Sequence, residues 1–181
     1  MTSNSVVFID SNVADSAALI DTLPTGTVWY KLNAVESGID QIATVLSSYS
    51  GLDSIQIISH GNVGTLYLGS DVINSGNIST YSNQLRGIGS SLVESGDILF
   101  YGCDVAAGAA GEYFINQMAE LSGADVAASS DLTGASSLGG NWKLESASGA
   151  VTTQPLSFEN YQNLLSDTTA PNISSLSIIP A

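Results

Sequence analysis

Short runs of apolar, mostly β-branched residues recur along the chain and predict buried strands. The first of these runs, VVFID, occupies residues 6–10 and is typical of a strand that is covered on both faces. Similar runs lead directly into His60 and Cys103. We expect strands at residues 6–10, 27–32, 54–59, 97–101 and 125–128.

The segments between these strands carry apolar residues at helical spacing. We expect helices at residues 15–23, 39–46, 79–95 and 109–121. Glycine or proline follows three of them and marks where the helix stops. Two further segments predict small β-hairpins. One is residues 65–73, where apolar and polar residues alternate, and the other is residues 139–151, near the C-terminus.

Strands that alternate with helices in this order indicate an α/β fold. We therefore expect a mostly parallel central sheet flanked by helices on both faces, with a small C-terminal β-hairpin. Residues 1–163 would form this single domain. Residues 166–171 are polar and end in Pro171, and an alternating pattern resumes after them, so residues 164–181 are predicted to be a linker and the start of a truncated, immunoglobulin-like domain. We expect the natural protein to be longer than this chain.

The charge balance excludes several classes of partner. The chain has 3 basic and 17 acidic residues, for a formal net charge of −14. Binding to nucleic acid phosphates or to anionic lipid requires clustered Lys and Arg, which this chain lacks. No apolar window approaches the length of a membrane span, so we expect no membrane insertion.

The composition also bears on localisation. Charged residues make up 11% of the chain while Ser, Thr, Asn and Gly abound, as in bacterial extracellular repeat proteins. We expect a secreted or cell-surface protein. The N-terminus has no secretory signal pattern, so the chain is cytoplasmic, is exported by a C-terminal signal outside this sequence, or has lost its signal.

Reactive or polar residues follow three of the predicted strands. His60 follows the third strand, Cys103 the fourth and Asp131 the fifth, and His60 and Cys103 are the only histidine and cysteine of the chain. In open parallel sheets, ligands bind just beyond the carboxyl ends of the strands. An imidazole beside a thiol can remove its proton or protonate a leaving amine. Gly61 and Gly102 beside the pair would allow sharp turns that aim backbone N–H groups at an oxyanion.

Each of these residues also has a structural interpretation. Cys103 could be a small buried packing residue, and His60 could be a loop or capping residue. Asp131 could be a turn residue that bonds its own backbone. Asp104 could contact substrate or cap the following helix, and we favour the cap.

The segments IQIISHG and DILFYGCD resemble the paired signatures of caspase-like cysteine peptidases, the group of caspases, legumain, gingipain, clostripain and separase. The resemblance implies that His60 is the general acid/base and Cys103 the nucleophile. It also implies an oxyanion hole formed by the backbone N–H groups of Gly61 and Cys103. Gly102 departs from the pattern, because Ala or Ser commonly precedes the nucleophile in that group.

The resemblance further implies that the loop after the fifth strand lines the pocket for the residue before the cleaved bond. Ser129 and Asp131 belong to this loop, and an acidic pocket floor would favour Arg or Lys in the substrate. Residues 6–163 are also similar to an uncharacterised bacterial domain family found near the start of very large repeat adhesins. The similar segments are VVFID, SHG, ILFYGCDVA, ASSDLTG and GGNWKLE.

No cofactor is expected. One His and one Cys cannot form a zinc site alone, and GxSxG, P-loop and GxGxxG motifs are absent. Calcium at the Asp- and Asn-rich residues 69–77 is conceivable, but the spacing does not match an EF-hand. Asp10 ends the first strand as acidic residues do in receiver domains. The other residues that phosphotransfer requires are missing.

We therefore predict a cysteine endopeptidase with a His60/Cys103 dyad that acts on a polypeptide. Its substrate would be its own parent chain, a large secreted surface protein, or a neighbouring surface protein. The alternative is a non-catalytic adhesion or assembly module that keeps the fold. A third hypothesis, a cytoplasmic α/β binding protein, predicts a buried, unreactive Cys103 far from His60.

Overall fold

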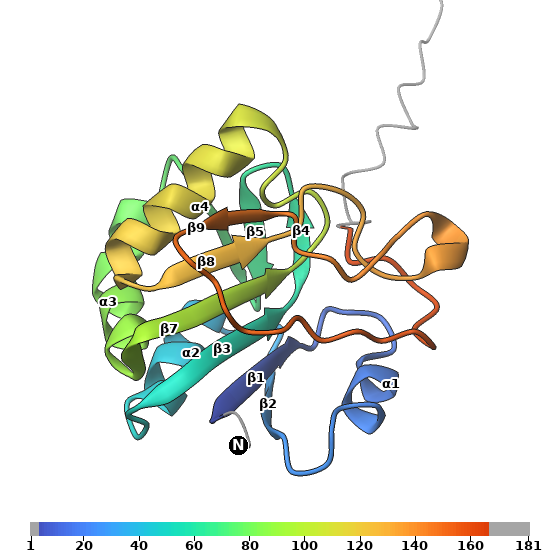
Figure 1. Cartoon of the computed structure of the whole chain (residues 1–181), viewed down its shortest axis with the longest axis horizontal. Coiled ribbons are helices and arrows are strands. Elements are labelled where there is room, and N and C mark those ends of the chain that lie inside the picture. The colour runs from blue at the N-terminus through green and yellow to red at the C-terminus, as the bar shows by residue number, and fades with distance from the viewer. Residues whose placement is uncertain (1–3, 167–181) are drawn as a thin grey trace, which may run out of the picture.

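The computed structural model describes residues 4–166, which form an α/β domain around a six-stranded sheet (Figure 1). Its first five strands in spatial order are parallel, and the last, β9, is antiparallel to β8. In spatial order the strands are β2 (Val28–Leu32), β1 (Ser5–Asp10), β3 (Leu52–Ile58), β7 (Leu92–Tyr101), β8 (Asp125–Ala128) and β9 (Ser146–Ser148). The predicted α/β architecture with a mostly parallel sheet is confirmed.

The two faces of this sheet are covered differently. The helices of the chain are α1 (Ser16–Asp21), α2 (Gly38–Leu46), α3 (Ser82–Ser90) and α4 (Gly108–Ser122), with short 3₁₀ turns at Ile78–Tyr81 and Ser136–Leu138. One hydrophobic cluster joins a face of the sheet to buried residues of α2, α3 and α4. A second cluster joins the opposite face to α1 and to the C-terminal residues Phe158, Tyr161 and Leu165. Figure 1 shows this orange-to-red C-terminal segment crossing the near face of the sheet.

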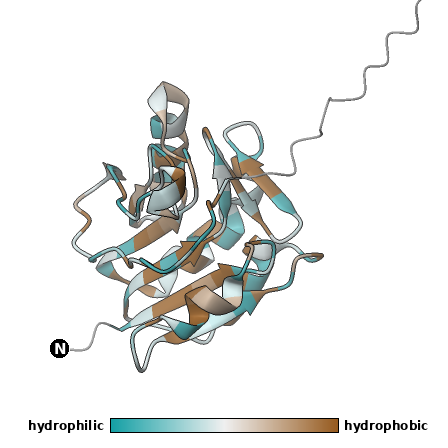
Figure 2. Ribbon diagram, turned by 90° about the vertical axis from the view of Figure 1, so that its right-hand side faces the viewer, coloured by the Kyte–Doolittle hydropathy of each residue, from teal (hydrophilic) through white to brown (hydrophobic). Residues whose placement is uncertain are grey.

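The central strands are buried because both faces of the sheet are covered. Every residue of β1 after Ser5 is buried, as are the last six residues of β7. The same strands stand out as hydrophobic in Figure 2. Their continuous apolar runs, which parallel strands require, are the reason why the sequence predicted them.

A second, antiparallel sheet of three short strands flanks the first. It contains β4 (His60–Asn62), β5 (Thr65–Leu68) and β6 (Asp71–Asn74) in that order. Strands β5 and β6 are the hairpin predicted at residues 65–73. Strand β4 was not predicted, because three residues that include glycine carry no strand pattern.

Two parts of the predicted helices and hairpins differ in the structure. Leu92 and Val93, assigned to a helix over residues 79–95, belong to strand β7, because α3 ends at Ser90. Residues 139–151 supply one strand, β9, which pairs with β8 rather than with a partner inside the segment.

The end of the domain lies beyond residue 163. Leu164 pairs with Gly134 in an antiparallel bridge, and Leu165 is fully buried. The predicted linker and following domain fall on residues 167–181, outside the described residues, apart from residues 164–166. No helix within residues 4–166 is long and apolar enough to cross a lipid bilayer.

Candidate active site

His60 and Cys103 lie at the same edge of the main sheet. Strands β3 and β7 are parallel neighbours, and Ile58 is paired in register with Tyr101. Each of the two candidate catalytic residues follows its paired residue by two positions. The topology therefore brings the two segments together at the carboxyl ends of the strands, where α/β folds bind ligands.

Glycine allows these two segments to approach closely. A Cβ added to Gly61 would lie 2.5 Å from a methyl carbon of Val105 and 2.8 Å from the carbonyl oxygen of Cys103. A Cβ added to Gly102 would lie 3.1 Å from the backbone nitrogen of Gly61. Gly102, the residue that departs from the caspase-like pattern, thus lies where the backbone after β7 closely approaches the backbone after β3.

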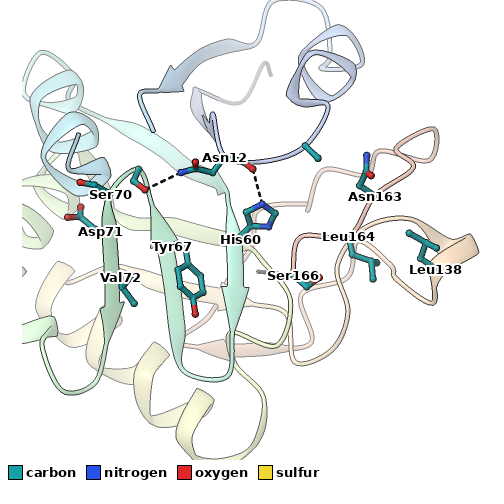
Figure 3. Close-up of a pocket in the computed structure, with 12 residues that line it drawn as sticks. Asn12, His60, Tyr67, Ser70, Asp71, Val72, Leu138, Asn163, Leu164 and Ser166 are labelled. Carbon is teal, nitrogen blue, oxygen red and sulfur yellow. Dashed lines mark hydrogen bonds between the residues drawn. The ribbon is translucent and has the colours of Figure 1, made fainter. Parts of the chain in front are cut away.

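The His60 ring is oriented by a backbone carbonyl. Its Nε2 lies 2.9 Å from the carbonyl oxygen of Asn12, and Figure 3 shows the ring turned toward this loop. A carbonyl can only accept, so Nε2 is the donor in this hydrogen bond, and in the neutral ring the lone pair is on Nδ1. Nδ1 is buried and has no hydrogen-bond partner within the described part of the chain. It is the ring atom that remains available as a base.

Asp10 holds the loop that supplies this carbonyl. Its buried carboxylate accepts hydrogen bonds from the backbone N–H of Asn12, at 2.8 Å, and from that of Gly69. The side chain of Asn12 also donates to the carbonyl of Gly69 at 3.1 Å (Figure 3). Asp10 and Asn12 therefore fix the loop between β1 and α1 against the small sheet that carries His60.

The Cys103 thiol is enclosed. The residue has no exposed surface, and its sulfur accepts a hydrogen bond from the Thr133 N–H at 3.2 Å and donates one to the Thr133 carbonyl at 3.4 Å. Burial raises the pKa of the thiol above its ordinary value, and the nearby carboxylates of Asp104 and Asp131 add to the rise. The backbone N–H groups of Thr133 and Leu165 lower it in part. In this arrangement the sulfur is a protonated thiol at neutral pH.

Two backbone N–H groups converge on one carbonyl oxygen beside this thiol. The N–H of Gly61 donates to the carbonyl oxygen of Leu165 at 3.0 Å, and the N–H of Cys103 donates to the same oxygen at 3.1 Å. These are the two groups that the caspase-like resemblance assigns to an oxyanion hole. A paired donor set with these distances has the geometry that stabilises a developing oxyanion.

The residues predicted to line the substrate pocket bond mainly within their own loops. The carboxylate oxygens of Asp131 accept from the side-chain amide of Asn141 at 3.0 and 3.1 Å. Ser129 is buried, and its hydroxyl donates to the carbonyl oxygen of Asp131 at 3.0 Å. Contact of either residue with substrate stays a prediction.

Asp104 does not cap the following helix. Helix α4 begins at Gly108 after Ala107, and no side chain makes a cap hydrogen bond there. The favoured interpretation of Asp104 as a cap is therefore wrong, because the helix starts four residues later. Asp104 instead adopts a left-handed backbone conformation with φ of 60°, and its N–H donates to the Asp131 carbonyl at 2.8 Å.

A cleft of about 490 Å³ lies beside His60. His60 and Tyr67 of the small sheet form one side of it, and Asn163, Leu164 and Ser166 form another (Figure 3). His60 lines this cleft, whereas Cys103 does not. Within residues 4–166, no three His, Cys, Asp or Glu side chains gather as a metal site would require.

Three contributors to the site were not identified from the sequence. Asn12 and Thr133 act through backbone atoms, which leave no mark in a side-chain pattern. Leu165 had a signal, because the pair Leu164–Leu165 is apolar within an otherwise polar stretch. We placed that pair in a linker, whereas it completes the core.

The chain matches the model of a protein family. The family described as "Domain of unknown function (DUF4347)" matches residues 6–165. No curated protein matches the chain. The family match covers most of the chain and ends at Leu165, the residue whose carbonyl meets the N–H groups of Gly61 and Cys103. The protein is therefore a member of this family of domains of unknown function.

Proposed function

We propose that the protein is a cysteine endopeptidase in which Cys103 is the nucleophile and His60 the general acid/base. The observation that carries the proposal is the pair of N–H groups, from Gly61 and Cys103, that meet on a peptide carbonyl next to the only thiol of the chain. The caspase-like resemblance assigns the same groups to the same roles.

The orientation of His60 supports its part in this proposal. Nε2–H is held by the Asn12 carbonyl, so Nδ1 is the ring atom that would take the thiol proton and pass it to a leaving amine. The thiol shares no hydrogen bond with this atom and donates to the Thr133 carbonyl, so the transfer requires the thiol to turn from Thr133 to His60. Asp10 and Asn12 act as positioning residues, because they hold the ring through the loop after β1.

The substrate is a polypeptide, and we propose the parent chain or a neighbouring protein on the cell surface. The secreted location and the link to large adhesins rest on composition and resemblance. Asp104 follows Cys103 directly, and Ser129 and Asp131 lie in the loop whose Thr133 is hydrogen-bonded to the thiol. They are candidates for contacts with substrate.

A second candidate function is a non-catalytic adhesion or assembly module that retains the fold. The complete burial of Cys103 and the raised pKa of its thiol favour this alternative, because both describe an unreactive packing residue. The two functions differ in one property, which is whether a peptide can bring an electrophile to the sulfur in the folded protein.

A thiol-directed peptide electrophile tests this difference. We expect it to label Cys103 in the folded protein, with His60→Ala slowing the reaction by about 10²–10⁴-fold. Asn62→Ala, on the exposed side of the same strand, should leave labelling unchanged. Adduct formation is measured by intact mass. Labelling that occurs only after unfolding, or that is equal in the His60→Ala variant, would favour the non-catalytic module.

A further inference from the structure

Residues 163–165 lie along the site as an extended peptide. The N–H of Leu165 donates to the Thr133 carbonyl at 2.9 Å, and the N–H of Ala135 donates to the Asn163 carbonyl at 2.9 Å. Between them, Leu164 and Gly134 form an antiparallel bridge. Peptide substrates are commonly bound in this way, by adding a strand to an exposed backbone edge.

The backbone hydrogen-bond partners of this segment change at the peptide bond between Leu165 and Ser166. The Leu165 carbonyl turns to the N–H groups of Gly61 and Cys103, and Ser166 continues in a parallel bridge with Gly61. The bond between Leu165 and Ser166 therefore separates two backbone pairings. Residues 163–165 before the bond pair with residues 133–135, and Ser166 after it pairs with Gly61 in the strand of His60. We infer that this bond is the substrate of the enzyme, and that the protein cleaves its own chain between Leu165 and Ser166.

The inference rests on the proposed peptidase function and specifies its substrate. The side chain of Leu165 is fully buried in the apolar cluster that also contains Cys103 and Tyr161. The pocket for the residue before the cleaved bond is then apolar and fits leucine. It differs from the acidic pocket for Arg or Lys that Asp131 suggested.

The backbone of residues 163–165 approaches Gly134 so closely that this position requires a glycine. Its φ of +131° strains any residue with a side chain, and a Cβ there would lie 2.3 Å from the Asn163 carbonyl oxygen. The segment ASSDLTG, in which this glycine lies, thus forms a backbone edge that admits a peptide at close range. The family match also ends at Leu165, the residue before this bond.

The chemistry balances with the groups present and one water molecule. The Cys103 thiol passes its proton to Nδ1 of His60, and the sulfur attacks the carbonyl carbon of Leu165. The oxyanion is held by the N–H groups of Gly61 and Cys103. As the C–N bond breaks, His60 protonates the Ser166 amine and a thioester remains. His60 then takes a proton from water, whose oxygen attacks the thioester carbon. The C–S bond breaks, the leaving thiolate takes that proton back from His60, and the new carboxylic acid of Leu165 releases its proton to solvent.

The bond and the nucleophile belong to one chain, so the reaction should be intramolecular. A tethered substrate has a high effective concentration and needs no second molecule. Cleavage would separate residues 1–165 from residues 166–181.

The test is incubation of the 181-residue chain, followed by intact-mass measurement. We expect fragments that end at Leu165 and begin at Ser166, at a first-order rate that is unchanged by about a hundredfold dilution. Cys103→Ala should stay intact, both alone and when mixed with the wild-type protein. Cleavage at another bond, or a rate that falls with dilution, would overturn the inference.

A second measurement separates failure of this inference from failure of the peptidase proposal. Leu165→Gly removes the side chain that fills the apolar pocket and keeps the backbone. Val35→Gly, at an exposed position, is its matched control. In Leu165→Gly, an electrophilic peptide ending in leucine should label Cys103 at least about tenfold faster than one ending in lysine. Labelling without cleavage of the wild-type chain would refute the self-cleavage and keep the peptidase. The absence of both would refute the two proposals together.

Discussion

The two faces of the main sheet are covered by different kinds of structure. On one face, helices α2, α3 and α4 present buried residues at helical spacing, such as Ile39, Ile42 and Leu46 of α2. On the other face, α1 is joined by the C-terminal segment, residues 142–165, whose only regular element is the three-residue strand β9. The first cover is held by hydrogen bonds within its own helices, whereas most of the second cover lacks them.

The C-terminal cover is instead held by side chains of the sheet and by aromatic packing. The buried Asp97 carboxylate accepts from the backbone N–H groups of Thr152 and Thr153 at 3.0 and 2.8 Å. The Tyr101 hydroxyl accepts from the N–H of Leu156 at 2.7 Å. The Trp142 and Phe158 rings pack edge to face with centroids 4.8 Å apart. Residues 163–165 add backbone hydrogen bonds to the loop of Thr133 and to the segments of Gly61 and Cys103, so the cover is fixed by contacts with distant parts of the chain.

The largest effect is expected on the helical face. Phe114 of α4 is fully buried, so Phe114→Ala should lower the free energy of unfolding by about 3–5 kcal/mol, through lost burial and the cavity left behind. Tyr113→Ala, at an exposed position of the same helix, should change it by less than about 0.5 kcal/mol. Denaturant unfolding measures both. Equal losses of unfolding free energy in the two variants would mean that packing of α4 against the sheet does not stabilise the fold.

An intermediate effect is expected where the C-terminal cover meets the site. Gly134→Ala places a Cβ against the Asn163 carbonyl and should cost about 1–3 kcal/mol. It should also speed alkylation of Cys103 by iodoacetamide below the unfolding transition, because residues 163–165 are displaced. Gly139→Ala has a similarly positive φ but no atom closer than 3.8 Å, and serves as the control. Equal alkylation rates in the two variants would show that the segment does not shield the thiol.

The smallest effect concerns the hydroxyl of Tyr161. It donates to the Ala14 carbonyl at 2.7 Å and links the C-terminal segment to the loop before α1, so Tyr161→Phe should cost about 1 kcal/mol at neutral pH. Burial, with the charges of Asp15 and Cys103, raises the pKa of this hydroxyl to about 12. A pKa raised by folding gives a stability that is complete below the unfolded value of about 10 and is lost as pH rises toward 12.

Unfolding measured across this alkaline range checks the assignment. The wild-type protein should lose stability between about pH 10 and 12 more steeply than Tyr161→Phe does. Tyr113→Phe, at an exposed site, should follow the wild-type curve. Coincident curves for Tyr161→Phe and the wild-type protein would place the alkaline sensitivity elsewhere, with Tyr101 and Cys103, whose pKa values burial also raises, as the next candidates.

The sequence predicted the central sheet well because parallel strands need unbroken apolar runs, and each run here is bounded by turn residues. Leu92 and Val93 were misplaced because they continue the spacing of Leu85 and Ile88, so the helical pattern runs into the strand. Only the structure shows that Ser90 ends the helix.

The candidate site was predicted in part, for a physical reason. His60 and Cys103 are rare residue types at strand ends, so they can be recognised in a sequence. The carbonyls of Asn12, Thr133 and Leu165 belong to the backbone, which every residue has. Their roles depend on the course of the backbone in the loops beyond the sheet, which the pattern of side chains in the sequence does not predict.

The Asp97 carboxylate has a consequence for what happens after self-cleavage. Because it ties down Thr152 and Thr153, and Tyr161 is tied to Ala14, the stretch up to Leu165 would stay bound when the bond to Ser166 is gone. The new terminal carboxylate would then occupy the place of the former carbonyl as a retained product. A second peptide would reach the thiol only when residues 163–165 leave the backbone edge of residues 133–135, so release of this product would set the rate of any further reaction.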